Sequence, residues 1–246
     1  MAAEATWPIF ITKLKNRKEV AERTMAFQFE KPADWTFKAG QFIDITLSNP
    51  PETDAEGNTR GFSIASAPQE DFLMVTTRLR DTAFKRSLKT VPVGTEVKVE
   101  GPFGNLVLHN NTSRPCVLLA GGIGITPFRS IVVRAAKEKL AHHIFLFYSN
   151  RRPEDAAFLE ELQALQKENP NFRLIATMTD MDKSHQPWQG EKGLINQEML
   201  SKNLKGVENA IYYIAGPAAM VNGLHSTLNA AGIDDDDIRT EEFTGY

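Results

Sequence analysis

The sequence predicts a six-stranded antiparallel β-barrel followed by an α/β domain with a parallel sheet. Two observations predict this fold class. Up to about residue 108, short runs of β-type composition are separated by turn residues, whereas from residue 115 onward apolar strands alternate with helices. The first pattern is typical of antiparallel barrels or sandwiches, and the second of a parallel sheet covered on both faces. We therefore expect a barrel domain over residues 1–110 and an α/β domain over residues 111–246.

The predicted barrel strands are bounded by clusters of proline, glycine, asparagine and aspartate, which are typical turn residues. The strands are expected at residues 7–14, 24–30, 41–47, 62–66, 72–79 and 96–101. The longest of the intervening segments is SNPPETDAEGN, residues 48–58, and we interpret it as a turn. Residues 81–90, DTAFKRSLKT, interrupt the strands and predict one short helix.

The second half alternates buried strands with helices. The strands are expected at residues 116–122, 143–150, 172–179 and 210–216, and the helices at 126–140, 153–169, 198–204 and 217–232. Thr126 and Pro127 fit the N-cap and the first turn of the first of these helices, and Gly232 fits the C-cap of the last. The acidic run Asp234 to Asp237 fits a solvated turn before a final strand.

Composition excludes several classes of protein. A net charge of -3 over 246 residues gives no electrostatic case for binding nucleic acid or an anionic membrane. The single cysteine, Cys116, excludes an intramolecular disulfide and an all-cysteine iron-sulfur centre, and its apolar neighbours predict that it is buried. No apolar run approaches the roughly 18 residues of a membrane span, and the N-terminus lacks a secretory signal, so we expect a cytoplasmic location. The five histidines lack further ligands at metal-binding spacing, and we predict no metal site.

Two glycine-rich turns follow predicted parallel strands. LLAGGIGITP, residues 118–127, lets the backbone approach a ligand closely and presents helix N–H groups to a diphosphate. Gly216-Pro217 ends a second strand in the same way and therefore lies at the same edge of the sheet. Together the turns predict dinucleotide binding, and the alternative for the first of them is an ordinary tight turn. No P-loop is present.

Six short segments, in this order, resemble the ferredoxin–NAD(P) reductase superfamily. They are Arg60-Gly61-Phe62-Ser63, GPFGNL at 101–106, AGGIGITP at 120–127, YSNR at 148–151, AGPAAM at 215–220 and EEF at 241–243. That family has a flavin-binding barrel followed by a nicotinamide-nucleotide domain. The resemblance implies a single-chain flavin reductase without an iron-sulfur domain, with FAD rather than FMN as bound cofactor and NADH or NADPH as substrate.

The resemblance also implies residue roles around the flavin. Arg60 is expected to pair with the diphosphate, Phe62 to lie along the isoalloxazine ring, and Ser63 to donate to the hydride-accepting nitrogen. Further flavin contacts are expected from Gly61, Thr77, Arg78, Thr82, Ala83 and Phe84. The family usually has tyrosine at the position of Phe62, a glycine near Thr82 and a serine at the position of Lys85, so these three residues are departures.

On the nucleotide side, the resemblance implies a cradle for the NAD(P)H diphosphate and ribose. Its expected members are Gly121, Gly122, Gly124, Thr126, Pro127, Ser149, Asn150, Arg151, Asp180, Gly216, Pro217 and Met220. Asp180 and Asp182 would repel a ribose phosphate and favour NADH, and the alternative is that both acids are solvent-facing turn residues. Many relatives have a cysteine where this chain has Ala215, so we predict no catalytic thiol.

The C-terminal segment RTEEFTGY supplies the last candidates. The resemblance places the carboxylate of Glu242 near the nicotinamide, as a catalytic residue together with Ser63. It also places an aromatic ring on the flavin, contributed by Phe243 or Tyr246. The alternative is an ordinary strand end with a frayed tail.

We therefore expect a flavoprotein oxidoreductase that transfers a hydride between NAD(P)H and bound FAD. Electrons would pass to or from a separate acceptor such as ferredoxin, flavodoxin or an oxygenase component. Two alternatives remain open: a free-flavin, quinone or ferric reductase, and a flavin-binding regulatory module without turnover. The sequence does not predict the oligomeric state or the identity of the acceptor.

Overall fold

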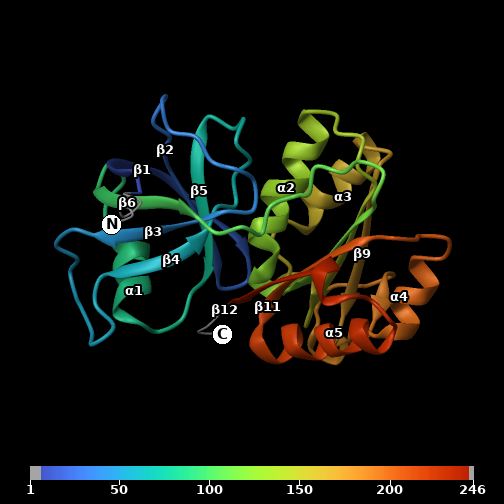
Figure 1. Cartoon of the computed structure of the whole chain (residues 1–246). Helices are drawn as coiled ribbons and strands as arrows, with labels where there is room; N and C mark the ends of the chain where they lie inside the picture. The colour runs from blue at the N-terminus through green and yellow to red at the C-terminus, as the bar shows by residue number, and fades with distance from the viewer. Residues whose placement is uncertain (1–6, 244–246) are drawn as a thin grey trace.

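The computed structural model describes residues 7–243, which form two six-stranded sheets lying side by side (Figure 1). The first sheet is antiparallel throughout, in the order β4-β3-β6-β1-β2-β5. Its strands are β1 (Ile9–Ala21), β2 (Thr24–Glu30), β3 (Phe42–Leu47), β4 (Thr59–Ser63), β5 (Phe72–Arg78) and β6 (Glu96–Phe103). A short helix, α1 (Ala83–Thr90), lies between β5 and β6.

The antiparallel sheet closes on itself into a barrel. Its two end strands, β4 and β5, meet through an antiparallel bridge between Ile64 and Val75, next to a 2.8 Å hydrogen bond from Ala65 N to Met74 O. Alternate residues point inward, as the burial pattern of β3 shows: Ile43, Ile45 and Leu47 are buried and their neighbours are half-buried. This alternation is what a strand with one buried face requires, and it fills the barrel with apolar side chains.

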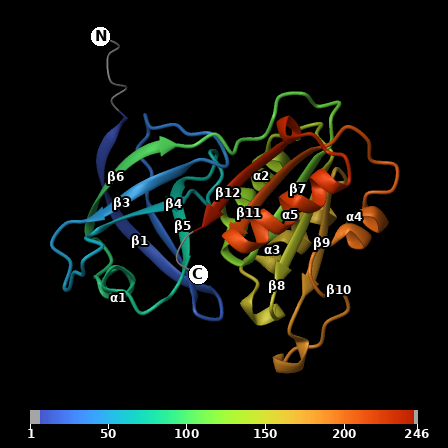
Figure 2. The same ribbon diagram turned by 60° about the horizontal axis from the view of Figure 1, so that its bottom comes forward.

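The second sheet is parallel, in the order β10-β9-β8-β7-β11-β12, with β12 nearest the barrel (Figure 2). Its strands are β7 (Cys116–Gly121), β8 (Ile144–Asn150), β9 (Phe172–Met178), β10 (Glu191–Lys192), β11 (Ile211–Pro217) and β12 (Ile238–Phe243). The chain adds strands outward from β7 to β10 and then returns to the other side of β7. This reversal creates a switch point between the carboxyl ends of β7 and β11, the place where open α/β sheets bind ligands.

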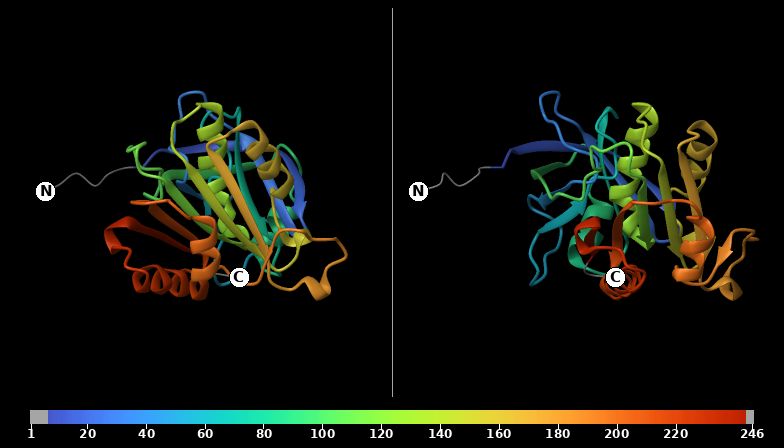
Figure 3. Two further views of the ribbon diagram at one scale, coloured as in Figure 1. Left: turned by 90° about the vertical axis from the view of Figure 1, so that its right-hand side faces the viewer. Right: turned by 45° about the vertical axis from the view of Figure 1, so that its right-hand side comes forward.

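Helices cover both faces of the parallel sheet (Figure 3). One face carries α2 (Ile125–Lys137) and α3 (Leu159–Glu168), whose apolar residues share a core with Ala39 and Leu106 of the barrel side. The other face carries α4 (Gln197–Asn203) and α5 (Ala218–Ala230). The two-sheet architecture confirms the predicted fold class.

Two predicted helices begin elsewhere than expected. The helix expected from residue 153 is interrupted, because a 3-10 turn at Pro153–Asp155 is followed by Phe158 in the left-handed region (φ 62°), and α3 starts only at Leu159. Thr126 was predicted as an N-cap, but α2 begins one residue before it and Gly124 occupies the cap. The Thr126 hydroxyl instead donates to Ile123 O at 3.0 Å.

Buried polar contacts join the barrel to the α/β half. Arg129 of α2 is only 5% exposed, and its Nη1 donates to Glu70 Oε2 at 2.9 Å and to Ala65 O at 2.7 Å, both on the barrel. Its Nε and Nη2 donate to Glu161 of α3 at 2.9 and 2.5 Å. Burial alone would raise the pKa of Glu70, but the hydrogen bond and charge of Arg129 hold that pKa below its usual value. The two halves are therefore held together by a satisfied ionic cluster.

Candidate functional site

The two predicted glycine turns meet at the switch point of the parallel sheet. A Cβ atom placed on Gly124 would lie 2.1 Å from Ala215 O, and one placed on Gly216 would lie 3.2 Å from the Cα of Gly121. The first distance leaves no room for a side chain and the second is a tight contact, so these glycines allow close backbone approach between the β7 and β11 turns. A Cβ on Gly121 would also lie 2.2 Å from Met220 Sδ of α5. The structure thus brings together four of the residues predicted to form the nucleotide cradle.

Asn150 ends β8 beside this cradle. It is 6% exposed, and within residues 7–243 neither its Oδ1 nor its Nδ2 has a hydrogen-bond partner. A buried amide without partners is costly, about 1–3 kcal/mol for each unsatisfied group, and native proteins rarely keep one without a role. The unpaired amide marks the carboxyl edge of the sheet as a place that accepts a polar ligand.

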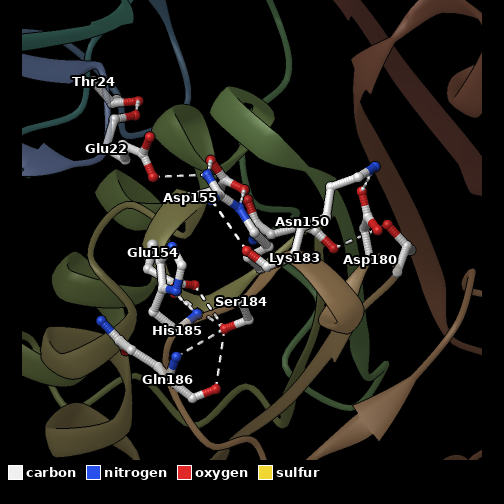
Figure 4. Close-up of polar contacts among 12 residues, drawn as sticks. Glu22, Thr24, Asn150, Glu154, Asp155, Asp180, Lys183, Ser184, His185 and Gln186 are labelled. Carbon is white, nitrogen blue, oxygen red and sulfur yellow. Dashed lines mark hydrogen bonds and ion pairs between the residues drawn. The ribbon is translucent and has the colours of Figure 1, made fainter.

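The loops after β8 and β9 form a polar network (Figure 4). Arg152 is held by Asp155 at 2.9 Å and by Glu22 of the barrel at 2.7 Å, whereas Arg151 is exposed. The carboxylate of Glu154 accepts hydrogen bonds from Ser184 Oγ and His185 N and fixes that loop. The network therefore engages Arg152 and leaves Arg151 exposed.

Asp180 lies in the same network, directly after β9. Its backbone N–H donates to Arg151 O at 2.8 Å, and its Oδ2 accepts from Lys183 Nζ at 2.8 Å (Figure 4). The predicted acid is therefore at the carboxyl edge of the sheet, as expected, but it is ion-paired. Lys183 was not among the predicted residues, although its i+3 spacing from Asp180 is visible in the sequence.

The end of β4 meets β12 across the junction between the two sheets. Ser63 Oγ donates to Glu241 Oε1 at 3.0 Å, and Ser63 is 6% exposed. Burial raises the pKa of Glu241, while the hydrogen bond from Ser63 acts in the opposite direction. A carboxyl group of elevated pKa therefore lies at the point where barrel and parallel sheet touch.

This carboxylate is not the one that was predicted. Glu242 is exposed, because successive side chains of a strand point to opposite faces and Glu241 points toward Ser63. Phe243 lies two residues after Glu241 and so shares its face. Side chains of a strand alternate between its two faces, so the sequence alone could have placed Phe243 on the same face as Glu241 rather than Glu242. Tyr246 lies outside the described residues.

A second cluster surrounds the start of α1. The guanidinium carbon of Arg60 lies 5.3 Å from the centre of the Phe84 ring, and the rings of Phe62 and Phe84 are 5.8 Å apart. Thr82 caps the helix by accepting from Lys85 N. Burial, and then the charges of Arg80 and Arg60, lower the pKa of Lys85 to about 8. The structure thus gathers the predicted residues Arg60, Phe62, Thr82 and Phe84 beside two further cations.

This cationic cluster holds an anion supplied by the chain itself. Asp54 Oδ2 accepts from Ala83 N at 3.1 Å at the start of α1, and Asp54 Oδ1 lies 3.4 Å from Arg60 Nη2. Glu56 Oε2 accepts from the same Arg60 nitrogen at 2.8 Å. The donors predicted for a diphosphate are therefore suited to an oxyanion. Both acids lie in the turn predicted at residues 48–58, and their contact with Arg60 was not predicted because it depends on how the loop folds back.

Comparisons with known proteins fit this arrangement. Residues 118–226 match the family model of the oxidoreductase NAD-binding domain. The FAD/NAD binding domain of a nitric oxide dioxygenase from Vibrio cholerae superposes with a TM-score of 0.81 at 20% identity, covering 95% of this chain and 98% of that one. A ferredoxin NADP+ reductase from Neisseria gonorrhoeae, solved with FAD and NADP, gives a TM-score of 0.76 at 23% identity over 95% and 98% of the two chains. The chain has the fold of the ferredoxin–NAD(P) reductase superfamily. The fold expected from the resemblance is therefore confirmed.

Two curated relatives align with most of this chain. The glycine betaine monooxygenase reductase subunit of Chromohalobacter salexigens is 28% identical over 224 residues, which are 90% of this chain and 60% of that protein. The toluate 1,2-dioxygenase electron transfer component of Pseudomonas putida is 27% identical over 234 residues, 94% of this chain and 66% of that protein. The chain thus spans less than two thirds of the length of either relative.

Within the ferredoxin reductase fold, β5 supplies a further polar group at the junction. The predicted residue Thr77 is buried, and its hydroxyl lies 3.4 Å from Arg78 O. The neighbouring Thr76 is 4% exposed, and its Oγ1 has no hydrogen-bond partner within residues 7–243. Thr76 shares the outer face of β5 with Met74, and β5 lies against the 3-10 turn Gly122–Gly124. The unsatisfied hydroxyl thus belongs to the strand that faces the nucleotide cradle, one residue before the predicted position.

The part of the chain that the structure describes contains no group of three or more acidic, histidine or cysteine side chains placed to hold a metal. Over the same residues, no helix is both long enough and apolar enough to cross a bilayer. Cys116 is completely buried, and burial raises the pKa of its thiol, so it does not present a thiolate at the junction.

Proposed function

We propose that this chain is a flavoprotein oxidoreductase that transfers a hydride between NAD(P)H and bound FAD and exchanges electrons with a separate acceptor. The observation that carries the proposal is the contact of Ser63 with Glu241. It brings the strand that bears the motif Arg60-Gly61-Phe62-Ser63 against β12, which pairs with β11 and so lies beside Gly216 of the proposed glycine cradle. Two ligands held at these two places would meet at one junction, as a transfer between cofactors requires.

The nicotinamide nucleotide would be held by residues 111–246. Gly121, Gly124 and Gly216 let the backbone approach a diphosphate at the switch point, and the unpaired amide of Asn150 offers both a donor and an acceptor. Asp180, at the end of β9, favours free ribose hydroxyls over a ribose phosphate. We therefore propose NADH as the preferred nucleotide.

The flavin would be held by residues 1–110. Arg60, Lys85 and the N–H groups at the start of α1 would bind its phosphates, and Phe62 would offer an apolar surface to its ring. When bound, a flavin supplies a ring that accepts a hydride and can release electrons singly. The Ser63 hydroxyl donates to Oε1 of Glu241, and the carboxyl of Glu241, with its raised pKa, can hold a proton on its other oxygen.

The relatives named as the reductase subunit of a monooxygenase and the electron transfer component of a dioxygenase support an oxygenase component or a ferredoxin as the acceptor. A second candidate, a reductase that uses flavin as an exchangeable substrate, is favoured by one observation. The hydrogen-bond donors of Arg60 already contact Asp54 and Glu56, so a flavin phosphate would have to compete for them. Such competition would favour weak retention of flavin.

The decisive experiment is anaerobic reduction of the purified chain loaded with FAD. We expect NADH to bleach the oxidised-flavin absorbance rapidly, and NADPH to do so more slowly. Failure of the chain to take up FAD would refute the proposal. Uptake of FAD without bleaching by either nucleotide would indicate a module without turnover, and bleaching with rapid loss of FAD on gel filtration would favour the flavin-exchanging reductase.

A further inference from the structure

The loop between β3 and β4, residues 48–58, is anchored along α1 by its acidic residues; we refer to it as the acidic loop. Asp54 contacts the start of the helix through Ala83 N at 3.1 Å. Glu52 accepts from Arg86 Nε at 2.8 Å and Arg86 Nη2 at 2.6 Å, farther along the same helix. The acidic loop therefore lies along the helix whose first N–H groups form the proposed phosphate site.

The acidic loop and the first residue of β4 occupy the terminal donors of Arg60. Arg60 Nη1 donates to the carbonyl oxygens of Glu56, Gly57 and Thr59 at 2.9, 3.0 and 2.8 Å. Arg60 Nη2 donates to Glu56 Oε2 at 2.8 Å and lies 3.4 Å from Asp54 Oδ1. A guanidinium binds a phosphate strongly when two of its N–H groups point at the same anion. With both terminal nitrogens engaged, Arg60 cannot offer that fork unless the acidic loop moves.

Basic side chains surround the site that the acidic loop occupies. Lys85 lies close enough to Arg80 and to Arg60 for their charges to interact, and burial together with these charges lowers its pKa to about 8. Two carboxylates, from Asp54 and Glu56, face this group of three basic side chains. A flavin phosphate would bring negative charge to the same donors, and the carboxylates would repel it. The acidic loop and the phosphate are therefore alternatives at one site.

We propose that the acidic loop is an autoinhibitory strap, in which Asp54 and Glu56 occupy the phosphate donors of the flavin site and phosphorylated flavins bind by displacing them. This inference rests on the proposed function, because it assumes that the donors around α1 serve a flavin. The opposite role, a buttress that orients Arg60 toward the phosphate, predicts the opposite effect of removing the acids. The sign of that effect therefore decides between strap and buttress.

The test compares dissociation constants for FAD, FMN and riboflavin at fixed salt and pH, measured by fluorescence titration of the full chain. The variants are Asp54→Asn, Glu56→Gln and the double variant. Glu96→Gln is the matched control, because Glu96 forms an exposed pair with Lys13 on the barrel, and its loss removes one negative charge away from the site. Riboflavin has no phosphate, so its affinity reports changes in the ring site alone.

We expect each single variant to bind FAD and FMN about three- to tenfold more tightly than the unaltered chain, the net scale of one ordinary hydrogen bond. Riboflavin affinity should change less than about twofold, and Glu96→Gln should match the unaltered chain for all three probes. Glu56 is largely exposed, so Glu56→Gln should fold normally even if Asp54→Asn loses stability.

Weaker or unchanged FAD binding in the variants would overturn the strap and leave the proposed function standing. Tighter binding of riboflavin by the same factor would also overturn it, because the gain would not involve phosphate. Tighter FAD binding without reduction by NADH or NADPH would support the strap while contradicting the proposed enzyme activity. Absence of flavin binding in every variant would refute both.

Discussion

Ser63 Oγ lies 3.0 Å from Glu241 Oε1, and this hydrogen bond joins residues 178 positions apart in the chain. Ser63 is the last residue of β4, and Glu241 lies near the end of β12, so the contact links the barrel to the parallel sheet. Glu241 pairs with Ala215 of β11, the residue before Gly216 of the second glycine turn. The pair is therefore the natural place to test whether transfer occurs at this junction.

Replacement of Glu241 should impair turnover far more than replacement of its neighbour. We expect Glu241→Gln to slow the reduction of bound FAD by NADH about tenfold to a hundredfold, because it removes an ionisable group from the junction. Glu242→Gln, a change of the same size on the exposed face, should stay within about twofold. Anaerobic stopped-flow reduction measures both, and equal losses would contradict the assignment.

The raised pKa of Glu241 also predicts a dependence of stability on pH. The folded protein holds the Glu241 proton more tightly than the unfolded chain, so this residue contributes stability below its usual pKa of about 4.3. That contribution is lost as the pH rises through the raised pKa. Glu241→Gln cannot ionise, so its free energy of unfolding relative to the unaltered chain should increase between pH 4 and pH 7. Urea unfolding at several pH values tests this, and a difference that does not vary with pH would show that burial does not penalise the ionised carboxylate.

Arg60 should govern flavin binding selectively. We expect Arg60→Ala to weaken FAD binding about tenfold or more, since it removes the charged fork beside the start of α1. Binding of NAD+ by the same variant should stay within about twofold. Arg134→Ala, at a half-buried arginine paired with Glu138, should affect neither ligand. Isothermal titration with each ligand is the measurement, and equal losses for FAD and NAD+ would count against the role of Arg60.

Much of the architecture follows from local patterns in the sequence, because period-two barrel strands and apolar parallel strands are both local features. The start of α3 does not, because the left-handed conformation of Phe158 interrupts a segment whose composition favours a helix throughout. In this case tertiary packing overrides propensity, since the Phe158 ring packs at 5.1 Å against the guanidinium of the buried Arg129.

Sequence motifs that lie at the end of a predicted strand made it possible to propose site residues directly. The cradle glycines, Arg60 and Ser63 belong to such motifs. The contacts of Asp54 with Ala83 and Arg60 were not predicted, because they depend on a loop folding back over a helix 29 residues farther along the chain. Glu241 was also missed, although the alternation of β12 would have identified it. The failures therefore lie in side-chain direction and loop placement.

Close packing of the glycine turns predicts different outcomes for two glycine substitutions. Gly124→Ala should destabilise the chain by about 1–3 kcal/mol, because its Cβ would meet Ala215 O at 2.1 Å. Gly223→Ala, in α5, meets nothing within 4 Å and should stabilise the chain by up to about 1 kcal/mol through helix propensity. Denaturant unfolding measures both, and a neutral Gly124→Ala would show that the two turns can separate.

The buried cluster around Arg129 should control the stability of the junction. Arg129→Met leaves Glu70 buried without its partner, and we expect a loss of about 3–5 kcal/mol in the free energy of unfolding at neutral pH. The pKa of Glu70 is lowered, so the stability it contributes is present above its usual pKa and lost as the pH falls through the lowered value. The difference between Arg129→Met and the unaltered chain should therefore shrink in acid. A loss of the same size at pH 3 and pH 7 would contradict this account.

Glu241 and Glu242 are adjacent in β12, so shortening the preceding turn by one residue would still leave a glutamate beside Ser63. Deleting one residue from the acidic turn Asp234–Asp237, with the pairing of β12 against β11 kept in place, would move Glu242 into the position opposite Ser63. A carboxylate would therefore face Ser63 both in the present chain and in the chain with the shortened turn. The residue two positions later would not be preserved, because Phe243 would move to the position that Glu242 occupies now, on the opposite face of the strand. The length of this turn is therefore constrained by the aromatic ring, whereas the acid has a duplicate next to it.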